Sequence, residues 1–345
     1  CICDTPEDAI NNDYVDFVIR REGEATLLEL LEAIRTKEKS ICFDNIPGLV
    51  FKRDGKIIKN VFRGQIHDLD VLPIPKRELV GMETYRDTVN ISTSRGCPGK
   101  CIYCSARILS GAPYRTRTME NVFLEIVLLK ATMKERINRV YFIDETFTAL
   151  TERVLEFIKI IKIYALDINW ICASRIDIMT EELIDHMASS RCEAVHFGIE
   201  SGNQEVLDKI QKGIDLVYAE RIISYMYKKK VIPLLSFMLG HYCDTVETMN
   251  DTLSFIKRMY SEYKADISVY FNTPFPGTWQ HTNKDKLGMT IKAKSYKNYS
   301  LIEPIVETEN FNINDQRKVY YESTKYFERY ARLNRERERM CLIND

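Results

Sequence analysis

Residues 95–104 read RGCPGKCIYC and place Cys97, Cys101 and Cys104 at spacings of four and three residues. A proline and a glycine between the first two cysteines indicate a loop, in which the three thiols can converge on one point. The stretch directly follows a run of strand-forming residues, TVNISTS at 88–94. The sequence therefore predicts a loop that carries three thiols and follows the end of a strand.

Six strand-like runs alternate with helix-length segments from Asp87 onward. The runs are rich in Val, Ile, Phe and Tyr, and most are almost continuously apolar, as expected for strands buried on both faces of a parallel sheet. They are TVNISTS (88–94), RVYFIDE (139–145), INWICAS (168–174), EAVHFGIE (193–200), IPLLSFML (232–239) and DISVYFNT (266–273). The alternation predicts an α/β fold of consecutive βα units. We expect a partial (β/α)6 TIM-like barrel of parallel strands, with its working residues at the C-terminal strand ends.

The segments between the strands have helical periodicity. They cover residues 119–135, 150–164, 181–189, 204–211, 216–228 and 246–260. Ser201 and Asp244 each lie three residues before a Gln or Glu, which is the spacing of a capping box. These two residues therefore predict where two of the helices begin.

The two ends of the chain differ from this core. Residues 26–37 predict a helix, and residues 48–62 predict a hairpin that turns at Asp54-Gly55. After about residue 290 the composition becomes polar and tyrosine-rich, and the last stretch predicts a charged helix. We expect four parts: a piece of another domain at 1–40, a connector with a β-hairpin at 41–86, the (β/α)6 core at 87–290 and a mostly helical C-terminal extension at 291–345.

The amino-acid composition limits the classes of protein to which this chain can belong. Hydrophobic residues make up 45% of the 345 residues and charged residues 29%, with 49 basic and 50 acidic side chains. This balance does not indicate nucleic-acid binding. The longest apolar runs reach only about half of the roughly 20 residues that a membrane-spanning helix needs, so we expect no membrane span. Ten cysteines without a signal peptide or a disulfide-like spacing favour a reducing cytoplasm.

Three kinds of site compete for the cysteine triplet. A zinc site normally takes four protein ligands, or three with an open position, but no histidine has a zinc-like spacing from the triplet. Buried structural cysteines are the second possibility, although three within eight residues of a Gly/Pro loop make a poor core segment. The third is a [4Fe-4S] cluster, in which three cysteines leave one iron free to bind a substrate.

The CxxxCxxC pattern, with Tyr103 before the last cysteine, resembles that of the radical S-adenosylmethionine (radical SAM) superfamily. The resemblance implies a [4Fe-4S] cluster on Cys97, Cys101 and Cys104, whose open iron chelates the methionine part of S-adenosylmethionine. An electron donor such as flavodoxin or ferredoxin would reduce the cluster. Reductive cleavage of S-adenosylmethionine would then give a 5'-deoxyadenosyl radical, which functionalises an unactivated carbon.

Polar residues at the C-terminal strand ends would then contact S-adenosylmethionine. Carboxylates near its ammonium group and an arginine near its carboxylate are favourable pairings. The expected cofactor-binding residues are Tyr103, Asp144, Glu145, Ser174, Arg175, Glu200 and Thr273. Competing roles are a charge at a helix N-terminus for Asp144 and an ion pair with Asp177 for Arg175. No catalytic proton donor or acceptor is assigned. His241 is expected in a surface loop, and a role as a local proton donor is the alternative.

A wider resemblance covers roughly residues 88–278 and concerns the radical SAM subgroup with an N-terminal cobalamin-binding domain. It is carried by WICASRID (170–177), FGIESGNQEVLDKIQKG (197–213) and NTPFPGT (272–278). Residues 14–34 resemble the last strand and helix of that Rossmann-like domain, so 1–40 is interpreted as its C-terminal remnant. The sequence starts without methionine, and we expect a segment before it. No histidine precedes His67, so the cobalamin-ligating Asp-x-His-x-x-Gly motif is absent.

The resemblance favours cobalamin-assisted methyl transfer as the reaction. Radical cyclisation, rearrangement or methylthiolation without cobalamin are the alternatives. A non-catalytic iron-sulfur electron carrier and a zinc-binding module are more remote ones, and the strand-end residues argue against a carrier because it needs no substrate cage. The substrate is left open between a small molecule, a lipid and a peptide.

Overall fold

The computed structural model describes residues 5–36, 43–80, 87–111, 113–133 and 137–341. Its centre is a six-stranded parallel sheet in the order β11-β10-β9-β8-β7-β4. The strands are β4 (Thr88–Ile91), β7 (Arg139–Phe142), β8 (Asn169–Ser174), β9 (Cys192–Glu200), β10 (Ile232–Leu239) and β11 (Asp266–Phe271). The predicted partial (β/α)6 barrel of parallel strands is confirmed.

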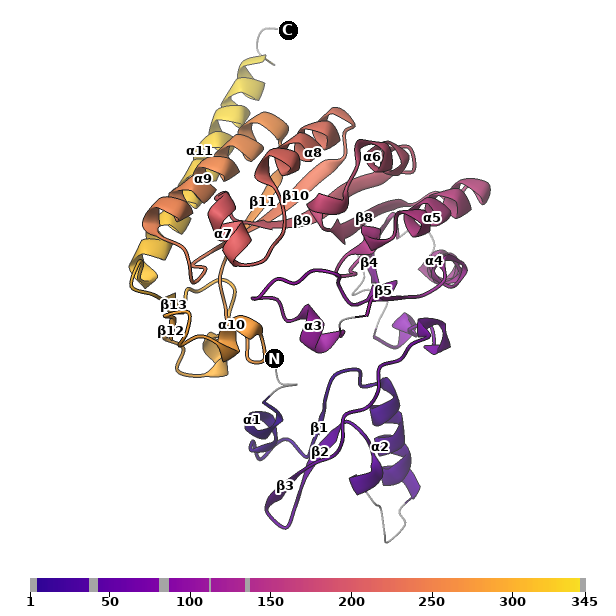
Figure 1. Cartoon of the computed structure of the whole chain (residues 1–345). Coiled ribbons are helices and arrows are strands. Elements are labelled where there is room, and N and C mark those ends of the chain that lie inside the picture. The colour runs from indigo at the N-terminus through magenta and orange to yellow at the C-terminus, as the bar shows by residue number, and fades with distance from the viewer. Residues whose placement is uncertain (1–4, 37–42, 81–86, 112, 134–136, 342–345) are drawn as a thin grey trace.

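Helices connect successive strands and lie along the outer side of the curved sheet (Figure 1). They are α4 (Met119–Met133), α5 (Thr151–Ile163), α6 (Glu181–Ala188), α7 (Gln204–Lys209), α8 (Leu216–Lys228) and α9 (Val246–Tyr263). Aromatic side chains fill part of the space between helices and sheet. The rings of Phe142 and Phe157 meet edge to face at 5.1 Å, and Phe157 contacts Trp170 at 5.5 Å. This packing fixes the sheet on which the site is built.

Several strands end earlier than predicted. β4 stops at Ile91 and β7 at Phe142, because the polar residues that follow leave the sheet and bond to one another. The backbone amides of Thr93 and Ser94 donate to the carboxylate of Asp144 at 2.6 and 3.1 Å. Tertiary hydrogen bonds therefore replace the last ladder bonds at the C-terminal edge of the sheet.

The two predicted helix starts are displaced by one or two residues. The N-cap of α7 is Asn203 and that of α9 is Thr245, and each side chain accepts from an amide of the first turn. Ser201 instead accepts from the amide of Asn203, and Asp244 accepts from the amides before it. Both side chains carry an oxygen that could cap a helix, but they accept hydrogen bonds from backbone amides of the preceding loop instead.

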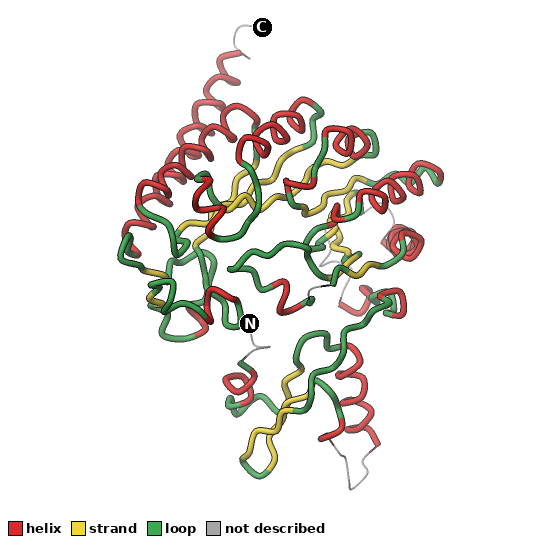
Figure 2. Tube along the Cα trace, viewed as in Figure 1, coloured by secondary structure: helices red, strands yellow, loops and turns green. Residues whose placement is uncertain are grey.

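The N-terminal part is a small antiparallel sheet with two helices and lies apart from the barrel in Figures 1 and 2. Its elements are α1 (Pro6–Ile10), β1 (Phe17–Ile19), α2 (Glu24–Thr36), β2 (Leu49–Arg53) and β3 (Lys56–Lys59), with β2 and β3 turning at Asp54-Gly55. The carboxylate of Glu22 joins this part to the core through Arg115 at 2.6 Å and Arg95 at 3.2 Å. The kinship of residues 1–40 with a cobalamin-binding domain, and the four domain boundaries, stay predictions.

The C-terminal extension packs beside α9. It contains the short strand β13 (Val306–Glu307) and the long helix α11 (Ile313–Cys341). Just before it lie α10 (Trp279–Thr282) and β12 (Thr290–Ile291), which pairs with β13. Tyr260 of α9 meets Phe327 of α11 edge to face at 4.9 Å. Within the described part of the chain, no helix combines the length and the apolar character needed to cross a membrane.

Candidate active site

The three cysteines lie in the cysteine loop, residues 96–105, between β5 (Ser94–Arg95) and the short helix α3 (Ala106–Leu109). β5 pairs with β6 (Arg115–Thr116), so the loop and α3 form an excursion closed at its base by this strand pair. Gly96 begins the excursion with φ of +96°, and a Cβ atom there would lie 2.4 Å from the carbonyl oxygen of Pro113. Only glycine fits this position, so the turn that presents Cys97 depends on it.

Each cysteine sulfur has its own hydrogen-bond donor. The backbone amides of Gly99 and Ala106 donate to the sulfurs of Cys97 and Cys104, both at 3.4 Å. The guanidinium Nη1 of Arg175 lies 3.7 Å from the sulfur of Cys101. N–H groups directed at sulfur stabilise the thiolate form, which is the form that binds iron.

The thiol of Cys104 holds its proton tightly in the cluster-free protein. Burial raises the pKa of Cys104 to about 11, the amide of Ala106 opposes this, and the neighbouring cysteines raise it further. Metal binding must therefore displace protons from this loop. Among the described residues, no three His, Cys, Asp or Glu side chains gather closely enough to share one metal ion. A cubane does not require this, because each thiolate binds a different iron.

Tyr103 of the cysteine loop and His241 form an aromatic contact, with ring centroids 5.5 Å apart. Burial raises the pKa of Tyr103 well above its usual value, and the charges of Glu200 and Cys101 add to this. His241 is fully buried, and among the described residues neither of its ring nitrogens has a hydrogen-bond partner. The expectation of a surface loop is wrong, because Asp244 accepts from the amide of His241 at 2.8 Å and folds the loop inward.

Arg175 and Glu200 lie beside the cysteines, at the ends of β8 and β9. Besides Cys101, Arg175 contacts Asp177 at 2.9 Å and donates to the carbonyl oxygen of Lys212 at 2.7 Å, so the competing ion pair with Asp177 is present as well. Glu200 accepts from the ammonium group of Lys212 at 3.1 Å. Its backbone has φ of +75°, a conformation that non-glycine residues rarely adopt.

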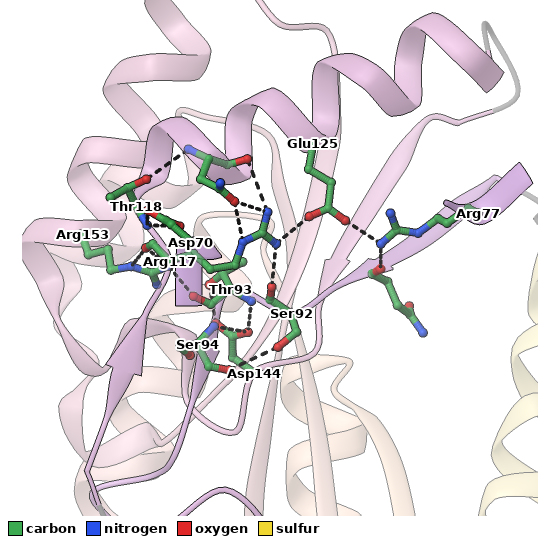
Figure 3. Close-up of polar contacts among 12 residues, drawn as sticks. Asp70, Arg77, Ser92, Thr93, Ser94, Arg117, Thr118, Glu125, Asp144 and Arg153 are labelled. Atoms are coloured by element: carbon green, nitrogen blue, oxygen red, sulfur yellow. Dashed lines mark hydrogen bonds and ion pairs between the residues drawn. The ribbon is translucent and has the colours of Figure 1, made fainter. Parts of the chain in front are cut away.

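The structure places Asp144 and Glu145 in hydrogen bonds within the protein. The carboxylate of Asp144 accepts hydrogen bonds from Thr93 and from Ser94, and Ser94 lies three residues before the first cysteine (Figure 3). Arg153 donates to the carbonyl oxygen of Thr93 at 2.8 Å and holds the same turn from the other side. Glu145 accepts a hydrogen bond from the hydroxyl of Ser110. Asp144 therefore supports the entry to the cysteine loop.

Ser174 and Thr273 are also bonded inside the protein and make no contact with the cysteines that the structure records. The hydroxyl of Ser174 bonds to that of Thr148 and donates to the carbonyl oxygen of its neighbour Arg175 at 3.1 Å. The hydroxyl of Thr273 donates to the carbonyl oxygen of Ser300 at 3.0 Å. Of the seven predicted cofactor-binding residues, the structure thus brings Tyr103, Arg175 and Glu200 to the cysteine loop.

Two residues of the site had no sequence prediction. The buried hydroxyl of Thr146 lies 3.2 Å from the sulfur of Cys97, and Lys212 is the buried partner of Glu200. Thr146 directly follows the acidic pair at the end of the second strand, and that position was its only signal. Lys212 lies among polar residues after a helix and gives no sign of burial.

A cavity of about 520 Å³ adjoins the loop, and two of the three cysteines line it. Cys101 and Cys104 line it together with Lys100, Arg107 and Gln211, and Trp279 of α10 forms another wall. A second cavity of about 490 Å³, lined by Gly99, Arg175 and Lys212 among others, lies next to it. Both cavities are of the size that binds small ligands.

Known proteins resemble this chain in sequence. Residues 91–256 match the family model of the radical SAM superfamily. An uncharacterised methyltransferase of Pyrococcus horikoshii is 32% identical over 303 residues, which are 86% of this chain and 64% of that protein. An anaerobic magnesium-protoporphyrin IX monomethyl ester cyclase of Synechocystis is 28% identical over 231 residues, which are 65% of this chain and 45% of the cyclase. The chain thus spans less than two thirds of either relative.

A solved structure resembles the fold. It is the radical S-adenosylmethionine methyltransferase TsrM from Kitasatospora setae, determined with cobalamin and a [4Fe-4S] cluster bound. The TM-score is 0.71 at 16% sequence identity, over 85% of this chain and 59% of TsrM. At this identity the likeness concerns the fold alone.

Proposed function

We propose that this member of the radical SAM superfamily holds a [4Fe-4S] cluster on Cys97, Cys101 and Cys104 and serves in radical methyl transfer to an unactivated carbon. The single observation that carries the proposal is that each of these three sulfurs has its own N–H donor. When bound, the cluster supplies the electron that cleaves S-adenosylmethionine reductively to the 5'-deoxyadenosyl radical. A one-electron donor such as flavodoxin or ferredoxin is the partner that we propose.

The residues present fit such a cluster. Three thiolates are the soft ligands that iron-sulfur clusters take, and a fourth protein ligand is not needed when the last iron binds substrate. Arg175 and Lys212 bring two positive charges to the Cys101 side of the loop. These cations offset part of the negative charge that the thiolates would carry.

We assign the binding of S-adenosylmethionine to the residues that face the cysteines. Glu200 offers a carboxylate to an ammonium or ribose hydroxyl group, Arg175 offers a guanidinium to a carboxylate, and Tyr103 closes the site from below. Asp144, Glu145, Ser174 and Thr273 hold the strand ends that present these groups, and we assign them positioning roles. The catalytic proton donor or acceptor is left unassigned.

Methyl transfer is favoured by the Pyrococcus relative, which is named a methyltransferase, and by the fold shared with TsrM. S-adenosylmethionine would be the methyl source as well as the radical source. The histidine motif expected for cobalamin does not occur in residues 1–345, so no residue of this chain is assigned to a corrinoid. The substrate stays open between a small molecule, a lipid and a peptide, and a reducing cytoplasm suits an oxygen-sensitive cluster.

Radical ring formation is the second candidate function. The observation that favours it is the sequence similarity to the cyclase of Synechocystis over 65% of this chain. Both reactions begin with the same cleavage of S-adenosylmethionine. They differ in whether a methyl group is transferred to the substrate.

The test is anaerobic reconstitution with iron and sulfide, followed by addition of S-adenosylmethionine and a reductant. We expect about four irons per chain and formation of 5'-deoxyadenosine. Cys97→Ala, Cys101→Ala and Cys104→Ala should each abolish the product, whereas Cys243→Ala, outside the triplet, should not. Wild-type protein without iron, or with a colourless zinc ion, would overturn the proposal.

A second measurement separates the two candidate reactions. With cobalamin added, methyl transfer consumes a second molecule of S-adenosylmethionine and releases S-adenosylhomocysteine. Its appearance only in the presence of cobalamin would support methyl transfer. 5'-Deoxyadenosine without any S-adenosylhomocysteine would favour cyclisation or rearrangement.

A further inference from the structure

Lys212 is a buried cation next to the cysteine loop. Only 7% of the residue is exposed, and its Nζ lies 3.1 Å from Oε1 of Glu200. Burial lowers the pKa of Lys212, but the charges of Glu200 and Cys101 outweigh this effect and raise it. The side chain is therefore an ammonium ion whose charge acts on the cysteine loop as well as on Glu200.

Arg175 links the backbone of Lys212 to the cysteines. One of its nitrogens donates to the carbonyl oxygen of Lys212 at 2.7 Å, while the other lies 3.7 Å from the sulfur of Cys101. Arg175, Lys212 and Gly99 also line one cavity. The backbone of Lys212 is thus held to the loop through the side chain of Arg175.

The chain accommodates the pair of Glu200 and Lys212 at a cost in stability. A buried ion pair often stabilises a protein less than apolar side chains of the same volume would. Glu200 also adopts a left-handed backbone conformation, which costs about 1–3 kcal/mol. Gly198 leaves room for the pair, since a Cβ atom there would lie 2.1 Å from Oε1 of Glu200. Two unfavourable features at one strand end, together with a glycine that leaves room for them, indicate a functional demand on the pair.

We propose that Lys212 is a positioning residue whose buried charge makes a cluster on the cysteine loop easier to reduce. The inference rests on the proposed function, because it concerns a cluster held by Cys97, Cys101 and Cys104. Reduction adds one electron from the external donor, with no bond formed or broken, and so makes the cluster more negative. A nearby fixed cation stabilises the more negative state.

The test measures the reduced fraction of the reconstituted cluster by electron paramagnetic resonance during a redox titration without S-adenosylmethionine. In Lys212→Gln we expect the ratio of reduced to oxidised cluster, at a fixed potential, to fall about tenfold, which equals a shift of about 59 mV for one electron. Lys212→Arg keeps the charge and should stay within about twofold of wild type. Lys209→Gln removes an exposed lysine of the same segment and should leave the ratio unchanged.

Lys212→Gln leaves Glu200 as an unpaired buried carboxylate, which can itself disturb folding. The double variant Glu200→Gln/Lys212→Gln removes both charges, so it is compared with Glu200→Gln, which keeps the ammonium group, and its ratio should be about tenfold lower than in that single variant. Equal ratios in these two variants, both with full iron content, would overturn the role of Lys212 but leave the cluster in place. Absence of the cluster from wild-type protein would instead overturn the proposed function.

Discussion

The carboxylate of Asp144 binds Thr93 twice, through its backbone amide at 2.6 Å and its hydroxyl at 2.5 Å. A third hydrogen bond comes from the amide of Ser94 at 3.1 Å. This contact joins the ends of β4 and β7 three residues before Cys97. The first turn toward the cysteine loop is thus held by one buried side chain of the neighbouring strand.

Asp144→Ala should destabilise the fold by roughly 3 kcal/mol, because it leaves two buried amides without an acceptor. The iron content after reconstitution should fall as well, since the same turn leads into the cysteine loop. Urea unfolding and iron analysis measure the two effects. Asp144→Asn keeps one acceptor oxygen and should cost about half as much. An Ala variant within 0.5 kcal/mol of wild type would contradict the bracing role.

Glu125 of α4 should be as sensitive, because it is a buried carboxylate between two arginines (Figure 3). Its oxygens lie 2.6 Å from Arg77 and 2.5 Å from Arg117 and so attach the connector to the barrel. Glu125→Ala leaves two cations unpaired and should lower the free energy of unfolding by about 3–5 kcal/mol. Glu120→Ala on the exposed side of the same helix should change it by no more than about 0.5 kcal/mol. Equal losses in the two variants would refute this.

Sequence periodicity was sufficient to predict the barrel. Its six strands are separate apolar runs with helical segments between them, and each run lies in the sheet. The strand ends were less predictable, because the side chain of Asp144 replaces ladder bonds just after β4 by accepting from Thr93, which is 51 residues away from it along the chain. Such a bond depends on which strands become neighbours in the sheet. The local pattern of apolar and polar residues does not contain that information.

Site residues were predictable where their side-chain chemistry suits cofactor binding and they lie at the end of a predicted strand. Arg175 directly follows β8 and lies 3.7 Å from the sulfur of Cys101. Glu200 is the last residue of β9, and its charge acts on Tyr103 of the cysteine loop. Lys212 was missed because a lysine among polar residues after a helix is ordinarily exposed, and it is buried here by a partner twelve residues earlier. His241 was misplaced for a similar reason, since the carboxylate that turns its loop inward lies outside the strand pattern.

Two glycines near the site should respond differently to alanine. A Cβ atom at Gly96 would meet the backbone oxygen of Pro113 in a left-handed turn, so Gly96→Ala should cost about 3 kcal/mol or more and reduce the iron content. A Cβ atom at Gly198 would meet only side-chain ends, those of Glu200 and Lys212, which can move. Gly198→Ala should therefore fold and bind iron but shift the redox titration in the direction of Lys212→Gln. Unfolding midpoints and iron content that are the same in both variants would contradict this distinction.

Asp244 and His241 should give opposite contributions to the pH dependence of stability. Burial raises the pKa of Asp244 to about 6, despite its hydrogen bonds from Thr248, His241 and Gly240. The folded state therefore binds more protons than the unfolded state between about pH 4 and 6, and this residue lowers stability by about 3 kcal/mol as the pH rises through that window. Burial lowers the pKa of His241 to about 4, with Glu200 opposing and Lys212 reinforcing the shift. The folded state then binds fewer protons between about pH 4 and 6.5, so stability rises by about 3 kcal/mol over that range.

In the wild type the two effects nearly cancel, and single variants should reveal each of them. The free energy of unfolding of Asp244→Asn minus that of wild type should increase by about 3 kcal/mol from pH 4 to 6, because the variant lacks the loss of stability that Asp244 causes in wild type over that range. The corresponding difference for His241→Gln should decrease by a similar amount from pH 4 to 6.5. Urea unfolding of the cluster-free protein at four pH values measures both differences, and taking differences removes the contribution of all other groups. A difference that does not vary with pH in either variant would show that the residue concerned titrates with its ordinary pKa, and hence that its side chain is in contact with water.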